Sequence, residues 1–448
     1  MAQVSYEPFR LPEIELPESV PEIPQAVFLE RQRKLSQAQQ SAGLDCIAIY
    51  ADREHAANLG WLTDFTPRFE EALWVQVAGR TPFMLAGNEC LSFARWVCKL
   101  EAEFELYQHF SLPNQDRSRS TDLMALLQKA GLGKGMKVGL IGWKPMDELD
   151  APHWVVRAFE KLTGLEPINA AGLLMSPADG LRTALEPEQI RFAEYASGLT
   201  SQGIKDWVFG LREGISEREA ALHLRSFGLE LSCHPMVNFG ADIPSGLGNA
   251  RNDRAERGFY AQSAFGTVGS LTCRAGRLVG SEYLEDSDGY LGIVENYLQA
   301  VRAWYAQIGV GTPARRAVEA VASAKSDDWT VALNPGHLIG WDEWLSSPFE
   351  AGSSIPLRSG MAIQQDIIPI PARGNAVINM EDGFVLADGE LRERLRRLDP
   401  QMMGRIDRRR DLMEQLGYSI GEDVLPLSNL AGAFFPYLLE PTFVAKFV

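Results

Sequence analysis

Apolar and polar positions along the first 180 residues predict short buried strands that alternate with helices. Short apolar runs are typical of buried strands, and apolar positions spaced roughly 3.6 residues apart are typical of helices that pack on a core. The predicted elements are a helix at 28–42 that Gly43 ends, a strand at 46–50, a hairpin pair at 73–77 and 82–85, a helix near 121–130 and a strand at 138–142. Alternating strands and helices imply an α/β domain, which we place at residues 27–179.

The pattern changes at Arg182, and a second domain is predicted at residues 180–389. Glu186 begins a long helix that runs to Trp207, and the segment 215–219 has the side chains of an N-capped helix start. The Gly-rich stretches predict strands with tight turns, and two further helices are predicted between them. The strands are expected within 235–280 and 360–388, and the helices at about 286–307 and 312–325.

Two further segments flank these domains. Residues 1–26 are rich in Pro and Glu and predict an extended arm. Residues 390–448 begin with a charged helical pattern and end in an apolar segment, and we treat them as a C-terminal extension. The sequence shows no internal repeat of a fixed short period.

Charge and cysteine content restrict the classes of partner. The formal net charge is −16, which argues against nucleic acid or an anionic membrane, because both require a basic face. The first residues lack a basic segment followed by an apolar one, so no signal peptide is expected, and no apolar stretch reaches membrane-spanning length. Five cysteines at irregular spacing predict free thiols and therefore a cytoplasmic protein.

Three residues near the end of the second domain carry the strongest chemical signal. His337 lies in a Gly-His-x-x-Gly turn, Asp366 follows a Gly-Met segment, and Glu381 lies in an Asn-Met-Glu-Asp-Gly segment. An imidazole and two carboxylates are suited to a metal site or to general acid–base catalysis. The stretch from Gly258 to Gly280, where further ligands would be expected, contains no Asp or Glu.

These motifs together resemble the "pita-bread" family of aminopeptidase P, prolidase and creatinase. The stretch 58–65 (NLGWLTDF) is similar to the N-x-x-Y-L-T-G-F stretch of that family's first domain, and 185–190 (LEPEQI) is similar to the opening of its catalytic domain. The resemblance covers about 27–388. It implies a creatinase-like α/β first domain, an α+β second domain of the pita-bread (creatinase/aminopeptidase) fold, and a homodimer.

The metallopeptidases of this family use two Asp, one His and two Glu as metal ligands. In this sequence His337 matches the His, Asp366 stands for the first Glu, and Glu381 matches the second. Ala264 and a neighbour such as Leu271 are expected at the two Asp places, and neither can bind a metal. The resemblance to creatinase, which has no metal, therefore favours a site without cofactor; if a metal binds, one divalent cation at His337, Asp366 and Glu381 is expected.

Other residues are candidates for substrate binding. Arg274 could hold a substrate carboxylate through two hydrogen bonds or could pair with Glu381. Trp344 stands where the family has a second His that supports peptide substrates, and Trp341 is the other aromatic residue of the same turn; both could form an apolar wall beside His337. His234, which precedes the Gly-rich loop that follows residue 239, and Asp242, which lies in that loop, are further candidates.

The expected function is creatinase-like, metal-independent hydrolysis of a C–N bond in a small polar amino-acid-like or amidine substrate. Two alternatives remain. One is an Xaa-Pro aminopeptidase- or dipeptidase-like metallopeptidase with an unusual metal site. The other is a pita-bread binding protein without catalysis. Ala264 and Trp344 favour the last, whereas His337, Asp366 and Glu381 favour retained chemistry.

Overall fold

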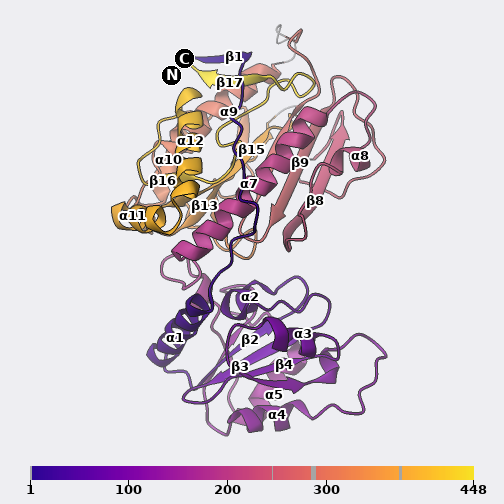
Figure 1. Ribbon diagram of the computed structural model, residues 1–448, viewed down its shortest axis with the longest axis vertical. Coiled ribbons are helices and arrows are strands. Elements are labelled where there is room, and N and C mark those ends of the chain that lie inside the picture. Colours follow the sequence, from indigo (N-terminus) through magenta and orange to yellow (C-terminus); the bar gives the residue numbers. More distant parts are fainter. Residues whose placement is uncertain (1–2, 245, 284–288, 373–375) are drawn as a thin grey trace. The chain divides into compact units, whose positions relative to one another are not determined.

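The computed structural model describes residues 3–244, 246–283, 289–372 and 376–448. The chain divides into two compact units, one formed by Ile23–Thr183 and the other by Met1–Glu22 together with Ala184–Val448 (Figure 1). Among the described residues, no helix combines the length and the hydropathy needed to span a bilayer.

The smaller unit is an α/β sandwich around a six-stranded mixed sheet. Strands follow each other across the sheet in the order β5-β4-β3-β2-β6-β7, and β2 pairs in parallel with β6 and antiparallel with β3. Its strands are β2 (Cys46–Ala51), β3 (Ala72–Val77), β4 (Phe83–Ala86), β5 (Glu103–Leu106), β6 (Val138–Ile141) and β7 (Ile168–Asn169). Its helices are α1 (Gln25–Ser41), α2 (Ala57–Thr63), α3 (Cys90–Val97), α4 (Leu123–Ala130), α5 (His153–Thr163) and α6 (Gly172–Met175), with a 3-10 turn at Gln108–Phe110.

The larger unit is built on an antiparallel sheet. The strand order is β12-β13-β15-β10-β9-β8, and β16 pairs with β15. These strands are β8 (Leu231–Gly240), β9 (Tyr260–Thr267), β10 (Thr272–Arg277), β12 (His337–Leu338), β13 (Ala362–Gln365), β15 (Asn379–Leu386) and β16 (Val424–Pro426), and β11 (Trp329–Val331) pairs separately with β14 (Pro369–Pro371). The helices are α7 (Pro187–Gly210), α8 (Glu217–Ala221), α9 (Tyr290–Tyr305), α10 (Arg315–Ala324), α11 (Gly389–Leu398) and α12 (Pro400–Gln415).

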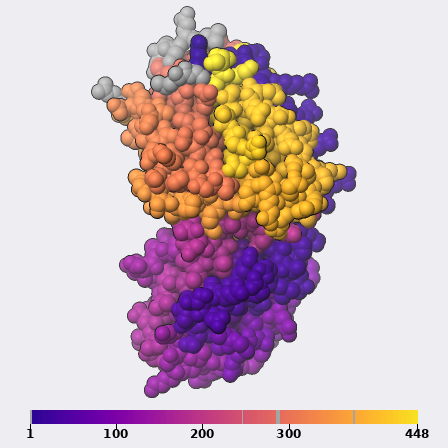
Figure 2. All heavy atoms as spheres, turned by 90° about the vertical axis from the view of Figure 1, so that its left-hand side faces the viewer, coloured from indigo at the N-terminus to yellow at the C-terminus, as the bar shows by residue number. Residues whose placement is uncertain are grey.

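The two ends of the chain meet in the larger unit. Strand β1 (Val4–Pro8) pairs antiparallel with β17 (Phe443–Phe447), so the first residues complete a ladder with the last. In Figure 2 the indigo N-terminal residues accordingly lie beside yellow C-terminal residues. Within the same unit, Glu194 of α7 forms buried ion pairs with Arg405 and Arg409 of α12, which fix α12 against α7.

Side chains alternate between the two faces of the larger sheet, and α7 and α9 pack on only one of them. Thr200 of α7 contacts Thr272 through their hydroxyl groups, and the Tyr297 hydroxyl of α9 bonds to the backbone of Met380. Because neighbours along a strand point to opposite faces, Cys273 and Glu381 point away from these helices. The chemistry-bearing residues therefore lie on the face opposite α7 and α9.

Candidate functional site

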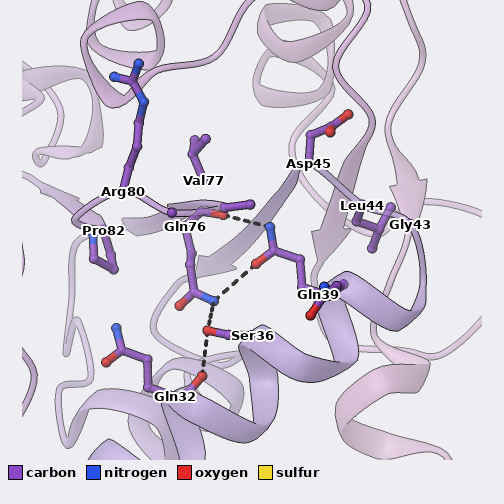
Figure 3. Close-up of a pocket in the computed structure, with 13 residues that line it drawn as sticks. Gln32, Ser36, Gln39, Gly43, Leu44, Asp45, Gln76, Val77, Arg80 and Pro82 are labelled. Atoms are coloured by element: carbon purple, nitrogen blue, oxygen red, sulfur yellow. Dashed lines mark hydrogen bonds between the residues drawn. The ribbon is translucent and has the colours of Figure 1, made fainter.

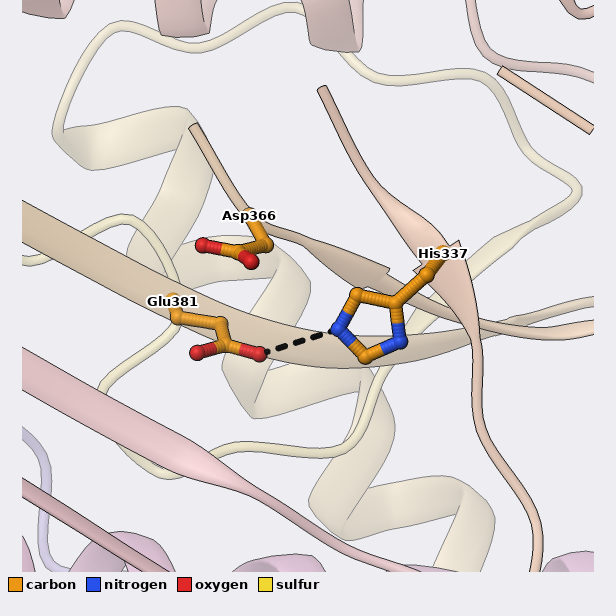
Figure 4. A group of neighbouring side chains, drawn as sticks. All are labelled: His337, Asp366 and Glu381. Carbon is orange, nitrogen blue, oxygen red and sulfur yellow. Dashed lines mark hydrogen bonds and ion pairs between the residues drawn. The ribbon is translucent and has the colours of Figure 1, made fainter. Parts of the chain in front are cut away.

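His337, Asp366 and Glu381 come together on the larger unit's sheet, from three separate segments. One ligand atom of each side chain lies within 4.8 Å of those of the other two, and the three residues are 1%, 5% and 5% exposed. Figure 4 shows the imidazole and the two carboxylates facing one another. The register explains this, because His337 pairs with Gln364 of β13, which lies two residues before Asp366, and β13 pairs with β15.

The backbone before His337 requires a glycine. Gly336 has a φ of +122°, and a Cβ at that position would lie 2.9 Å from both the Gln364 carbonyl oxygen and the Trp304 ring. A side chain there would therefore combine strain with a clash. The Gly-His pair places β12 directly against β13, which brings the imidazole to the carboxylates.

The tautomer of His337 follows from its hydrogen bonds. Nδ1 lies 3.2 Å from the Leu338 carbonyl oxygen, which can only accept, so Nδ1 carries the proton. Nε2 then presents its lone pair to Glu381, whose Oε1 lies 3.4 Å away. Trp344 stacks on the ring with centroids 4.2 Å apart and planes 15° apart. The imidazole is thus oriented as a metal ligand with its free nitrogen toward the carboxylates.

The shifts of the pKa values in the cluster indicate that its buried carboxylates are not balanced by enough positive charge. Burial raises the pKa of Asp366 well above its usual range, and the neighbouring Glu381 raises it further. Burial and the Glu343 carboxylate raise the pKa of Glu381 to about 8. Burial lowers the pKa of His337, against the opposing effect of Asp366. In the absence of metal these shifts therefore favour protonated carboxyl groups and a neutral imidazole.

The cluster has the properties of a cation site. The Oδ1 atom of Asp366 is buried and makes no hydrogen bond within the described part of the chain. Two carboxylates and one imidazole are suitable ligands for Zn²⁺ and related divalent ions. A divalent cation would compensate both buried carboxylates and occupy the unpaired oxygen, so the residues present fit one ion.

Strand register identifies the residues that stand beside Glu381. Cys273 lies directly opposite Glu381 on one side and opposite Ala264 on the other. Leu271, which we had expected at an Asp place, lies two residues before Cys273 in the chain. The residue in line with Glu381 is thus a thiol, and the expectation that Leu271 stands at an Asp place stays a prediction.

Arg274 does not point into the cluster. Its guanidinium forms a buried ion pair with Asp382 at 2.8 Å and donates to the carbonyl oxygens of Glu381, Leu430 and Ala433. These acceptors lie on β15 and on the segment after β16. Arg274 therefore joins two strands to the C-terminal segment on the opposite face of the sheet from the site and pairs with Asp382, whereas the sequence suggested Glu381 or a substrate.

The remaining candidates are placed less centrally. His234 and Asp242 are exposed, the first on β8 and the second in the turn after it. Trp341 and Trp344 are half-buried on the segment that folds back along β12, where Leu345 donates to the Leu338 carbonyl oxygen. Of these four residues, Trp344 is the one that contacts a member of the cluster.

Two residues near the cluster were not assigned a function from the sequence. The Cys233 thiol on β8 donates to the His234 carbonyl oxygen at 3.6 Å, and burial together with the nearby Glu343 carboxylate raises the pKa of the thiol. Spacing alone could not reveal that the segment of Cys233 and the turn that contains Glu343 meet, because they lie far apart in the chain.

The smaller unit has a polar cavity with different chemistry. The cavity has a volume of about 530 Å³ and lies between α1 and the turn that joins β3 to β4. The Gln76 amide donates to Ser36 and Gln39, both at 3.3 Å, as Figure 3 shows. Its lining residues include one carboxylate, Asp45, and one guanidinium, Arg80, which points away from these amides in Figure 3. This cavity lacks paired acid–base groups, so the cluster on the larger sheet is the better candidate for catalysis.

Comparison with solved structures establishes the fold. Similar structures include an Xaa-Pro dipeptidase from Bacillus anthracis (18% identity, 81% of this chain and 96% of that one, TM-score 0.62). An X-Pro aminopeptidase from Thermotoga maritima matches at 18% identity over 80% of this chain and 95% of that one, with a TM-score of 0.60. The N-terminal domain of FACT complex subunit SPT16 from Cicer arietinum matches at 16% identity over 82% and 95%, with a TM-score of 0.59. No protein-family model matches the sequence, and no curated protein matches it either.

The comparisons confirm the predicted fold and correct one expectation about cofactors. The chain has the pita-bread fold, with an additional N-terminal domain, as the resemblance implied. Prolidases and X-Pro aminopeptidases are the metallopeptidases of that fold, so their predominance among the similar structures contradicts the expectation of a protein without metal or other cofactor. The buried cluster of His337, Asp366 and Glu381 agrees with this correction.

Proposed function

We propose that this protein is a single-metal hydrolase that cleaves a C–N bond in a small peptide-like substrate. The activity would be that of an Xaa-Pro dipeptidase or aminopeptidase with an altered metal site. The observation that carries the proposal is the buried cluster in which one ligand atom each of His337, Asp366 and Glu381 lies within 4.8 Å of the others. The names of the similar solved structures support the same class of substrate.

The residues of the cluster would hold one divalent cation. When bound, such an ion lowers the pKa of a coordinated water and polarises a substrate carbonyl group. His337 would bind through Nε2, because its Nδ1 proton is committed to Leu338. Asp366 and Glu381 would release their protons and bind through carboxylate oxygens. Trp344 covers one face of the imidazole and would shield a bond from Nε2 to the ion from water on that side.

The substrate would enter an acidic site. Glu343 lies near Glu381 and raises its pKa, and Arg274 is committed to Asp382 on the opposite face of the sheet. Once one cation is bound, the carboxylates of Glu343, Asp366 and Glu381 still leave a net negative charge. We therefore expect substrates with a cationic group near the scissile bond, such as a free α-amino group.

An assay with a panel of Xaa-Pro dipeptides and longer Xaa-Pro peptides, in the presence of Mn²⁺, Co²⁺ or Zn²⁺, tests this function. We expect proline release or N-terminal cleavage that requires metal. In His337→Ala the rate should fall by at least about 100-fold. Trp154→Phe, on the smaller unit's α5, serves as the control and should retain the parent rate. Equal rates in the parent and in His337→Ala would refute the proposal.

A second candidate function is binding without catalysis. Ala264 and Cys273 stand in line with Glu381, and a FACT complex subunit shares the fold. In that case metal-loaded protein would bind Xaa-Pro peptides in calorimetry and return them uncleaved. The two measurements on one sample, binding and turnover, separate the candidates.

Cellular location and assembly remain proposals as well. The five cysteines are free in the structure, which is consistent with a reducing cytoplasm. The resemblance implies a homodimer. Light scattering on the purified protein tests this, and a monomer at micromolar concentration would contradict it.

A further inference from the structure

Three residues form a row across the sheet beside Asp366. Ala264 of β9, Cys273 of β10 and Glu381 of β15 are directly opposite one another in the two antiparallel ladders. Residues that are directly opposite share a face, with Cβ atoms about 4.5–5.5 Å apart. The Cys273 thiol is therefore on the same face as the Glu381 carboxylate and is its direct neighbour.

The surroundings of Cys273 suit a metal-binding thiol. The residue is 1% exposed, and its sulfur accepts a hydrogen bond from the Asn379 amide at 3.4 Å. Burial raises the pKa of the thiol, and the carboxylates of Glu381 and Asp366 raise it further. The unpaired Oδ1 of Asp366 is an independent sign that the same face lacks a cation.

The sulfur is not yet in ligand position in this structure. It does not belong to the group of atoms that lie within 4.8 Å of one another, which comprises His337, Asp366 and Glu381. To reach the cluster, the sulfur would have to leave the Asn379 contact by a rotation about the Cα–Cβ bond of Cys273. Such rotations between staggered positions are ordinary for side chains.

We propose that Cys273 is the fourth protein ligand of the cation, and that the resulting His, Asp, Glu and Cys set selects a thiophilic ion. The inference rests on the proposed function, because it concerns the same site. Thiolate favours Zn²⁺ and similar ions, whereas carboxylate and water suit Mg²⁺ and Mn²⁺. On binding, the S–H bond breaks, a metal–sulfur bond of roughly 2.3 Å forms, and the proton passes to the buffer.

Cobalt substitution reads the sulfur directly. Co²⁺ bound by a thiolate gives an intense near-ultraviolet charge-transfer band, which nitrogen and oxygen ligands alone do not give. We expect this band in the parent protein loaded with one equivalent of Co²⁺ and its absence in Cys273→Ser. Cys233→Ser is the matched control, because Cys233 is the other buried thiol near Glu381, and it should keep the band.

Metal preference supplies a second measurement. Cys273→Asp replaces the thiol with an oxygen ligand, so competition between Zn²⁺ and Mn²⁺ should shift toward Mn²⁺ by about 10-fold or more. Circular dichroism verifies that each variant is folded, and the Asp variant keeps the test valid if the Ser variant does not fold.

The outcomes separate the inference from the proposed function. A parent that binds one Co²⁺ without the charge-transfer band, or a band that survives in Cys273→Ser, overturns the role of Cys273 and leaves the proposed function standing. Loss of the band in Cys233→Ser alone also overturns it. A parent that binds no Co²⁺ overturns both.

Discussion

At the scale of single residues, His337 is fixed by three neighbours that hold its Nε2 toward Glu381. Leu338 holds the Nδ1 proton, Trp344 stacks on the ring, and Glu381 faces Nε2. This arrangement orients the lone pair before any ligand arrives, so little ordering remains to be done on binding.

Replacing His337 should weaken metal binding more than it weakens the fold. Loss of an outer partner of a metal ligand already costs roughly 10- to 100-fold in affinity, and loss of a ligand should cost at least that. Calorimetric titration of Zn²⁺ into His337→Ala measures the loss. An affinity equal to that of the parent would exclude His337 as a ligand.

The affinity for metal should rise with pH, whereas the free energy of unfolding of the metal-free protein should fall. The pKa of Glu381 is raised from 4.5 to about 8, so the folded protein binds more protons than the unfolded chain between these values. The free energy of unfolding of the metal-free protein should therefore fall as pH increases from about 5 to about 8. Bound metal should abolish this fall, because it replaces the proton on the carboxylate.

Thermal unfolding between pH 5 and 8, with and without Zn²⁺, measures both effects. A metal-free Tm that increases over this interval would contradict the account, as would an equal pH dependence in the two samples. The variant Glu381→Gln, which cannot ionise, should show a flatter metal-free profile than the parent.

At the scale of elements, the register of β9, β10 and β15 decides what the site contains. A shift of one residue would turn Cys273 to the helix-covered face and Arg274 to the site. The buried ion pair of Arg274 and Asp382 opposes such a shift, because it joins β10 to β15 on the helix-covered face.

Arg274→Met should destabilise the protein by about 3–5 kcal/mol, because it leaves the Asp382 carboxylate buried without its partner. Chemical denaturation monitored by tryptophan fluorescence measures the difference. Arg257→Met is the control, because its ion pair with Glu213 is half-exposed and should contribute less than about 1 kcal/mol. A loss below about 1 kcal/mol for Arg274→Met would mean that the pair does not hold the strands.

The sequence predicted most elements but not the register that joins them. Periodicity placed the helix that starts at Gln25, the β3–β4 hairpin and the long helix after Glu186 within a few residues of their bounds. The capping box at Ser216 also formed as its side chains predicted. Hairpin register depends on the turn between β9 and β10, and periodicity did not reveal that Cys273 lies directly opposite Glu381.

The same limit applies to the site. Its three central residues could be recognised because glycines frame His337 and the motifs follow a family pattern. Cys233 could not, since it approaches the cluster from a strand that is distant in sequence, and spacing did not reveal that Glu343, in the turn that follows His337, lies near Glu381. The partner of Arg274 was equally hidden, because Asp382 and Glu381 are adjacent and only the strand's alternation assigns them to opposite faces.

At the scale of the whole molecule, metal binding should stabilise one unit of the chain. The cluster lies within the unit formed by Met1–Glu22 and Ala184–Val448, and the sheet of Ile23–Thr183 has no residue in it. At a metal concentration about 100 times the Kd, the stabilisation should be about 2.7 kcal/mol. Hydrogen exchange should slow in peptides from β10, β13 and β15 and remain unchanged in β2 and β3. Equal slowing in both units would show that metal acts elsewhere or on the whole fold.

The number of ions that each chain binds tests the central claim most directly. The protein is stripped with chelator, dialysed against Zn²⁺ or Mn²⁺ and analysed for metal, with His337→Ala treated in parallel. The account predicts one ion per chain in the parent and a large loss in the variant, because the described site offers His337, Asp366 and Glu381 as one cluster of ligands. Two ions per chain, no ion, or one ion that persists in His337→Ala would contradict it.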